Sequence, residues 1–112
     1  MRPSRGEIWL VSLDPVVGRE QAGMRPALIV SVNQFNHGPA ELVVLVPITT
    51  TRRNVPLHVT LSPIETGLSY VSSAKCEDVR SVSLKRLDRC LGAVAPSTLE
   101  LVEDRMRILL GL

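Results

Sequence analysis

Hydrophobic and polar positions along the chain form short apolar runs separated by turn residues, a pattern typical of β-strands. The runs lie at residues 7–13, 26–32, 41–48, 57–61, 70–75, 79–82 and 90–94. The run at 57–61 alternates apolar with polar, which predicts a strand with one face in solvent, whereas the run at 7–13 is apolar on both faces. No helix of crossover length separates the runs, so we expect a small antiparallel barrel or half-barrel and exclude a doubly wound parallel sheet.

The sequence near the C-terminus predicts a helix. Ser97 and Glu100 have the spacing of a capping box, in which the hydroxyl and the carboxylate satisfy the first free amides of a helix. Apolar residues line one helical face at Leu99, Val102, Met106 and Leu109 and a second face at Leu101 and Ile108. Because this apolar surface is wider than one small barrel needs, and the first strand is apolar on both faces, we expect a dimer. Residues 83–86 are expected to form a single helical turn.

The segment from residue 16 to residue 24 has no convincing period and is predicted to be a long loop, which in compact domains is often functional. It leads into Arg25 and Pro26. Pro26 fixes its own φ and favours an extended conformation at Arg25, so the guanidinium is held at the mouth of a strand. The planar N–H donors of the Arg25 guanidinium match the oxygens of a phosphate, and Glu20 and Gln21 lie a few residues earlier in the chain. The alternative is an ordinary surface arginine beside a loop.

Composition narrows the possible partners. The 112 residues predict a single domain, 1–112, and 45% hydrophobic with 21% charged residues is typical of globular domains. Aromatic residues make up only 3%, which argues against base stacking on an aromatic platform. The net charge of +2 is too small to attract a polyanion by itself, so binding of a polyanion would depend on a local cluster of arginines. No run approaches the roughly 18 apolar residues that span a membrane, and no signal-peptide core is present, so we expect no membrane association and a cytoplasmic location.

The usual catalytic devices are missing from the sequence: it has no glycine-rich phosphate loop, no metal-spaced histidine and cysteine set, and no nucleophile elbow. Cys76 and Cys90 are too sparse for a zinc site or a disulfide scaffold, and both are expected to be reduced and buried. His37 and His58 are expected to be solvated surface residues, which disfavours a ribonuclease that uses a histidine pair.

A set of polar and charged residues remains as the candidate site. It comprises Glu20, Gln21, Arg25, Thr49, Thr50, Thr51, Arg52, Arg53, Lys75, Glu77, Asp78 and Arg80. Glu20 would serve as a base, Arg25 as an electrostatic clamp and Thr49 as a hydrogen-bond donor to developing charge on a phosphate. Arginine holds its proton too tightly to shuttle it, so charge stabilisation is the role we derive for Arg25. Two alternatives stay open: Glu77 and Asp78 as a solvated turn, and the threonine hydroxyls as partners of strand-end backbone groups.

Five blocks of the sequence carry a family resemblance. They are Arg5-Gly6-Glu7-Ile8-Trp9, Leu13-Asp14-Pro15 with Gly18, Glu20-Gln21-Ala22-Gly23 before Arg25-Pro26, Pro47-Ile48-Thr49, and Glu77-Asp78-Val79-Arg80. In this order and spacing the chain resembles the MazF/PemK family of toxin endoribonucleases, the mRNA interferases of toxin–antitoxin modules. The resemblance implies an SH3-like barrel of the CcdB/MazF type, mainly β with a C-terminal helix, that forms a homodimer.

The same resemblance implies an activity and a partner. It implies cleavage of single-stranded RNA at short sequences, with no metal and no cofactor, through attack by the RNA's 2′-hydroxyl to leave a 2′,3′-cyclic phosphate and a 5′-hydroxyl. Arg25 and Thr49 match the family's catalytic pair, and Glu20 sits where some members have a functional glutamate. A MazE-like antitoxin would wrap the dimer with a disordered tail and block the RNA groove.

The chain departs from the family pattern at two places. Glu7 stands where aspartate is commoner, on a turn expected to be exposed, and Glu77-Asp78 replaces an acid followed by glutamine in the segment that would line the RNA groove, which leaves the base preference open. Two other functions compete. One is a CcdB-like toxin that binds a topoisomerase, although such toxins rely on a Trp-Gly-Ile tail and this chain ends Leu110-Gly111-Leu112. The other is a catalytically dead member kept as an antitoxin or RNA-binding partner.

Overall fold

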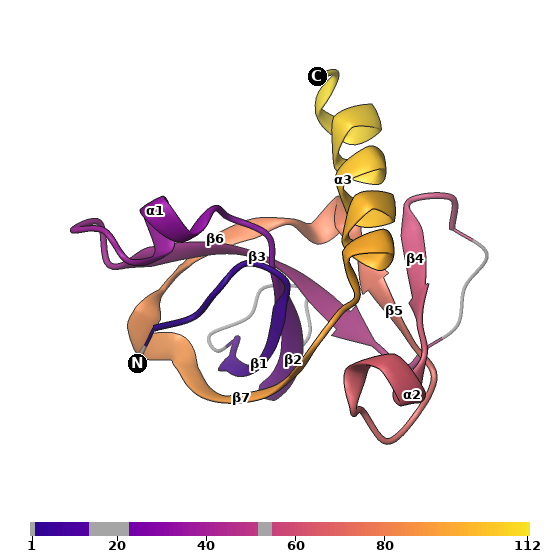
Figure 1. The fold of residues 1–112 in the computed structure, drawn as a ribbon, viewed down its shortest axis with the longest axis horizontal. Coiled ribbons are helices and arrows are strands. Elements are labelled where there is room, and N and C mark those ends of the chain that lie inside the picture. Colours follow the sequence, from indigo (N-terminus) through magenta and orange to yellow (C-terminus); the bar gives the residue numbers. More distant parts are fainter. Residues whose placement is uncertain (1, 14–22, 52–54) are drawn as a thin grey trace.

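The described residues form a curled antiparallel sheet of seven strands in a computed structural model (Figure 1), which describes residues 2–13, 23–51 and 55–112. The strands are β1 (Glu7–Ser12), β2 (Met24–Ile29), β3 (Leu42–Thr49), β4 (His58–Leu61), β5 (Ser72–Lys75), β6 (Arg80–Ser83) and β7 (Leu87–Ala93). Their order is β4-β5-β3-β2-β1-β7, with β6 paired to β3. The sheet is not closed, because no ladder among the described residues joins β4 to β7. The fold is the predicted mainly β class with a C-terminal helix.

Helical segments fill the connections and end the chain. They are α1 (Asn33–Asn36), α2 (Pro63–Thr66), the 3₁₀ turns η1 (Cys76–Asp78) and η2 (Leu84–Arg86), and α3 (Pro96–Leu110). The predicted turn at 83–86 is thereby confirmed, and the turn residues after β2 form one helical turn before the chain reverses. None of the helices within the described ranges is long and apolar enough to cross a membrane.

The C-terminal helix is confirmed, but its predicted capping box is wrong. Ala95 is the N-cap and no side chain caps the helix; Pro96 opens its first turn instead of Ser97. Proline suits this position because its fixed φ is already helical and its missing N–H would have had no partner there. The backbone N–H of Ala95 donates to the Glu65 carboxylate of α2 at 2.5 Å, so a distant residue satisfies the start of α3.

Two clusters of buried residues lie on opposite faces of the central strands. One contains Ile8, Leu28, Val30, Val46, Ile48, Val59, Leu61, Ala74, Cys76 and Val102. The other contains Trp9, Val11, Leu13, Ala27, Ile29, Val43, Leu45, Val82 and Leu87. In β1, Ile8 belongs to the first cluster and Trp9 and Val11 to the second, and in β2 Leu28 and Ile29 divide in the same way. The first strand therefore has buried residues on both sides, as predicted. Strands packed on both faces form a rigid scaffold, because close-packed interiors resist displacement.

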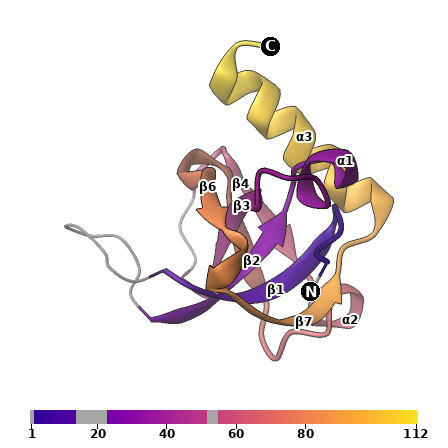
Figure 2. The ribbon, with the colours of Figure 1, turned by 90° about the vertical axis from the view of Figure 1, so that its left-hand side faces the viewer.

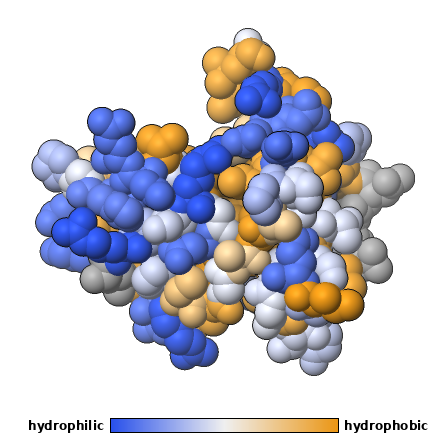
Figure 3. Space-filling view, in the orientation of Figure 1, coloured by the Kyte–Doolittle hydropathy of each residue, from blue (hydrophilic) through white to orange (hydrophobic). Residues whose placement is uncertain are grey.

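The helix α3 packs on the first cluster and leaves much of its length uncovered. Val102 is buried, and the Arg5 guanidinium pairs with Glu103, which ties α3 to the barrel. The helix projects from one end of the sheet (Figure 2). Apolar residues near its C-terminal end stand in solvent (Figure 3), among them Ile108 and Leu110. The wide apolar surface expected from the sequence is present; the dimer that it predicts stays a prediction.

Strand boundaries differ from the sequence prediction at several ends. β2 begins at Met24, so Arg25 lies inside a strand and pairs with Val11 of β1. β7 begins at Leu87, because Leu87 and Arg89 pair with β1 although the sequence there shows no apolar run. Glu7 is a strand residue and not part of an exposed turn: its Oε1 accepts bonds from the Ser4 N–H at 2.6 Å and from the Trp9 ring N–H at 3.1 Å.

Candidate functional site

Arg25 and Thr49 lie on one face of neighbouring strands. The β2–β3 ladder pairs Ala27 with Pro47, and continuing this antiparallel register by two residues sets Arg25 opposite Thr49. Because side chains alternate with a period of two, each shares the face of its partner in the ladder. Arg25 is exposed near the start of β2, and Thr49 is 8% exposed at the end of β3. The guanidinium and the hydroxyl therefore approach the same surface from adjacent strands.

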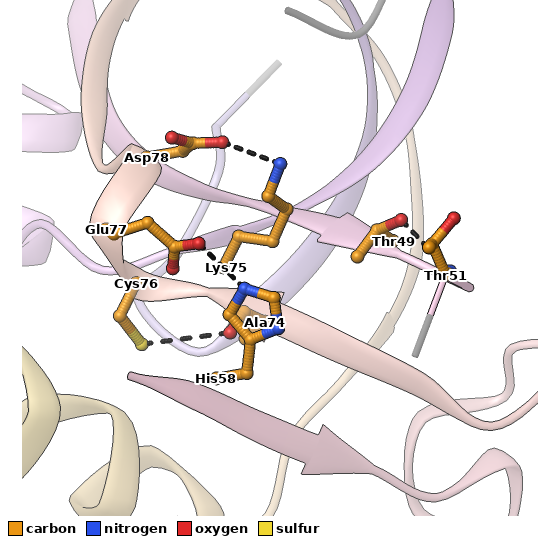
Figure 4. A network of polar contacts seen from close by, with 8 residues as sticks. All are labelled: Thr49, Thr51, His58, Ala74, Lys75, Cys76, Glu77 and Asp78. Carbon is orange, nitrogen blue, oxygen red and sulfur yellow. Dashed lines mark hydrogen bonds and ion pairs between the residues drawn. The ribbon is translucent and has the colours of Figure 1, made fainter. Parts of the chain in front are cut away.

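The Thr49 hydroxyl has a defined orientation. Its Oγ1 accepts a hydrogen bond from the backbone N–H of Thr51 at 3.1 Å, which is a local turn typical of threonine at a strand end (Figure 4). This confirms the alternative in which a hydroxyl satisfies a strand-end backbone group. A hydroxyl that accepts one bond still has its own O–H to donate. Thr49 can thus serve the backbone and a substrate oxygen together, while Thr50 and Thr51 are exposed.

The polar face continues across β5 and β4. Thr49 pairs with Ser73 of β5, and Lys75, two residues further along the same face, pairs with His58 of β4. The Lys75 ammonium lies 2.8 Å from the Asp78 carboxylate in η1. In Figure 4 the Lys75 side chain rises between Thr49 and the η1 turn. Lys75 therefore belongs to the same surface as Thr49, with its charge close to that of Asp78.

His58 is buried, and the prediction that it is a solvated surface residue is wrong. Its side chain is 6% exposed, and its Nε2 lies 2.7 Å from Oε2 of Glu77, whose side chain is 30% exposed. The solvated-turn alternative for Glu77 is therefore wrong too. The alternation along β4 identified a polar face, but the sequence gives no sign that η1, far along the chain, covers it. His37 is exposed as predicted, with its Nε2 2.9 Å from the Pro3 carbonyl.

The other predicted site residues are more scattered. Arg80, at the start of β6, pairs with Leu45, which places it on the Thr49 face but about 13 Å away along β3, at roughly 3.3 Å per residue. Asp78 is half exposed, and Glu77 is turned inward to His58. Glu20, Gln21, Arg52 and Arg53 lie outside the described residues. The structure thus brings together Arg25, Thr49 and Lys75, with Glu77 and Asp78 beside Lys75.

The two thiols differ in environment. Both cysteines are free; Cys76 is buried as predicted, whereas Cys90 is exposed, so that half of the prediction is wrong. Burial, with a further contribution from the Glu77 charge, raises the pKa of the Cys76 thiol to about 11. A thiol with this pKa stays protonated near neutral pH and is a poor nucleophile. Within the part of the chain that is described, no group of three His, Cys, Asp or Glu residues is placed to hold a metal ion.

The fold and this face define a small SH3-like barrel protein whose polar surface is shared by β2, β3 and β5. The family model described as "PemK-like, MazF-like toxin of type II toxin-antitoxin system" matches residues 4–110. The chain belongs to this family.

Relatives and solved structures agree with this assignment. The chain is 36% identical over 113 residues to Endoribonuclease MazF9 of Mycobacterium tuberculosis, covering 96% of each protein. It is 33% identical over 110 residues to Endoribonuclease toxin MazF of Escherichia coli K12, covering 97% of this chain and 95% of that one. Its fold is similar to that of MazF from Deinococcus radiodurans, with a TM-score of 0.87, 26% identity and coverage of 100% and 99%. An endoribonuclease in complex with its cognate antitoxin, from a mycobacterial species, gives a TM-score of 0.82 at 30% identity, covering 98% and 96%.

Proposed function

We propose that this chain cleaves single-stranded RNA with the RNA's own 2′-hydroxyl as the nucleophile. The chain is a type II toxin endoribonuclease by family, and the proposal concerns its chemistry. The 2′-oxygen forms a bond to phosphorus as its proton leaves, the bond from phosphorus to the 5′-oxygen breaks, and that oxygen takes up a proton. The products are a 2′,3′-cyclic phosphate and a 5′-hydroxyl. Neither a metal ion nor a cofactor takes part.

The shared face of Arg25 and Thr49 is the observation that carries this proposal. As 2′-oxygen attack proceeds, negative charge builds on the oxygens of phosphorus. The Arg25 guanidinium offers several donors in a planar arrangement that matches those oxygens, and the Thr49 O–H adds one more from the adjacent strand. Arg25 stabilises charge and does not carry the proton. Glu20, which lies outside the described residues, is our candidate base.

RNA binding is assigned to the cations and polar groups around this pair. Lys75 shares the face with Thr49, and Arg80 lies further along it. Together with Gln21, Thr50, Thr51, Arg52 and Arg53 they would contact phosphates and sugars, which fix the register of the strand without reading its sequence. Asp78, half exposed beside Lys75, offers carboxylate oxygens to amino groups of a base, so we assign it to base recognition.

We further propose that the chain acts in the cytoplasm as a homodimer restrained by a MazE-like antitoxin. The exposed apolar residues of α3 exceed what one barrel covers, which supports a second copy. The antitoxin is supported by similarity to the MazE-MazF complex of Deinococcus radiodurans, with a TM-score of 0.81 at 29% identity. The alternative of a topoisomerase-binding toxin would leave the shared face of Arg25 and Thr49 without a role.

The decisive experiment is incubation of the purified protein with long single-stranded RNA in EDTA, followed by mapping of the new ends. We expect cleavage at a short recurring sequence, with 5′-hydroxyl and 2′,3′-cyclic phosphate ends. Cleavage that requires added Mg²⁺, or that leaves 5′-phosphate ends, would refute the proposed chemistry. Intact RNA together with tight binding to a topoisomerase would favour the alternative function.

A further inference from the structure

The His58–Glu77 pair lies beside the candidate site, with the imidazole covered and the Glu77 carboxylate partly exposed, and the chemistry proposed above does not use it (Figure 4). Nε2 of His58 lies 2.7 Å from Oε2 of Glu77, and the imidazole is almost wholly covered. Among the described residues, Nδ1 of His58 and Oε1 of Glu77 are buried side-chain atoms without a hydrogen-bond partner. Burying polar atoms without hydrogen-bond partners costs stability, so this pair adds little to the stability of the fold.

The pair is positioned to control Lys75. His58 stands directly opposite Lys75 in the β4–β5 ladder, and Thr49 is opposite Ser73, which makes Thr49 a diagonal neighbour of Lys75. Two consecutive carboxylates, Glu77 and Asp78, follow Lys75 in the chain. Asp78 holds the Lys75 ammonium at 2.8 Å, whereas Glu77 is turned toward His58. The lysine thus contacts Asp78, while the imidazole contacts Glu77.

We propose that His58 is a positioning residue for RNA binding, which holds the Glu77 carboxylate away from Lys75 and so keeps the ammonium available to a phosphate. This inference rests on the proposed function, since it takes Lys75 as a phosphate contact. A carboxylate has only acceptor atoms, so Nε2 of His58 must carry the proton and donate it in the bond to Glu77. That bond occupies Oε2 of Glu77 and reduces the attraction of the carboxylate for the nearby ammonium.

Without His58, the Glu77 carboxylate would need another cation. Arg105 also acts near η1, where its charge lowers the pKa of the Cys76 thiol, but its Nε donates to the Pro56 carbonyl at 3.0 Å and its terminal nitrogen lies 2.6 Å from Asp104. Lys75 stands opposite His58 in the β4–β5 ladder and next to η1, so we expect it to be the cation that the freed carboxylate meets. Its ammonium would turn from the Asp78 side toward Glu77, and an additional negative charge would face the incoming phosphates. Both changes weaken RNA binding and leave Arg25 and Thr49 untouched.

The test separates substrate binding from chemistry in the full-length protein. KM and kcat are measured in EDTA on a single-stranded RNA containing one cleavage site, for H58L, H58Q, E77Q, the double variant H58L/E77Q and the control H37L. For H58L we expect KM to rise about tenfold, equivalent to about 1.4 kcal/mol, with kcat within about twofold. H58Q retains an N–H donor for Glu77 and should restore most of the affinity. The control H37L should keep KM close to the wild-type value. E77Q, at a residue of the candidate site, is the reference for the double variant: the double variant should match E77Q and bind RNA more tightly than H58L.

The double variant H58L/E77Q tests whether the charge of Glu77 causes the loss of RNA affinity in H58L. If the loss in H58L comes from the uncompensated charge of Glu77, removing that charge must rescue KM. A double variant as weak as H58L, an unchanged KM in H58L, or a loss of kcat alone would each overturn the inference. Circular dichroism checks folding, and H58N, whose side chain is too short to reach Glu77, replaces H58L if that variant does not fold.

A separate measurement distinguishes failure of this inference from failure of the proposed function. The same RNA with a 2′-deoxy sugar at the cleavage site binds but cannot be cut by the proposed route. If the wild type binds this RNA but cuts no RNA, the proposed chemistry fails, and a weaker Kd in H58L, restored in the double variant, would still support the positioning role. Equal Kd values in all variants would refute that role while leaving wild-type cleavage unaffected.

Discussion

Replacing Thr49 with valine removes one hydroxyl from the candidate site and keeps the branched shape of the side chain. The residue is 8% exposed at the end of β3, and valine has nearly the same volume and branching as threonine, so the substitution changes little besides the hydroxyl. Two interactions disappear: the hydrogen bond accepted from the Thr51 N–H, which exists in the free protein, and the bond donated to phosphorus oxygens, which would form during the reaction.

The two losses have different magnitudes and different observables. Thr51 is exposed, so water replaces the lost bond to its N–H, and the free energy of unfolding should fall by about 0.5–1 kcal/mol. For a domain of this size that corresponds to a fall in Tm of roughly 2–5 °C. Losing one preorganised donor to developing negative charge costs far more, and we expect kcat to fall by about 10²–10³. KM should change little, because the bond strengthens only as charge develops.

The assay is single-turnover cleavage of a fluorescently labelled RNA in EDTA, with thermal unfolding measured in parallel. T49S is the matched control, since it restores the hydroxyl and should recover most of the activity and the stability. Wild-type kcat in a folded T49V protein would refute the assignment of Thr49. A large rise in KM at constant kcat would show that the hydroxyl binds the ground state and does not stabilise the charge that develops later.

Two further predictions concern the same face, and a third concerns Cys76 in the first apolar cluster. R25A should abolish detectable cleavage in a folded protein, and R25K should recover only part of it, because an ammonium keeps the charge but not the planar set of donors; equal rates for R25K and wild type would contradict the clamp. K75A should weaken RNA binding and reduce the slope of log Kd against log salt by about 0.7, the value for one phosphate contact on a single strand, as measured by anisotropy titration over a salt series. Burial raises the pKa of the Cys76 thiol from 9.0 to about 11, so between these pH values the folded state holds a proton that the unfolded state releases. The contribution of Cys76 to the free energy of unfolding should therefore be fully present below pH 9 and be lost as the pH rises from 9 to 11. Denaturant unfolding of C76A, which should lack this pH dependence, provides the comparison.

The sequence predicted the parts of this molecule that depend on local pattern. Strand positions followed from short apolar runs between turn residues, and the run apolar on both faces proved to have buried residues on both sides. Pro26 correctly indicated an extended Arg25, because proline restricts the residue before it wherever the chain goes. Thr49 and Arg25 were found by residue type and by family resemblance, while their common face depends on the β2–β3 register, which the sequence does not state.

The failures concern residues whose environment is set by distant parts of the chain. Ser97 and Glu100 have the spacing of a capping box, yet Pro96 starts the helix and Glu65 satisfies Ala95 from α2. His58 occupies a polar strand position, which in isolation predicts solvent, but η1 folds over it and supplies Glu77. Neither contact leaves a local signal, because each joins segments separated by 19 residues or more.

β3 changes neighbours along its length: residues 42–45 pair with β6 and residues 48–49 with β5. The change falls at Pro47, which lacks an N–H and so has no donor to leave without a partner on the edge where one ladder stops and the next begins. A barrel this small has no second lobe against which to form a cleft. Because β3 changes its neighbour, side chains from β2, β3 and β5 meet on one surface. Pro47 allows this change of neighbour without leaving a backbone N–H unpaired.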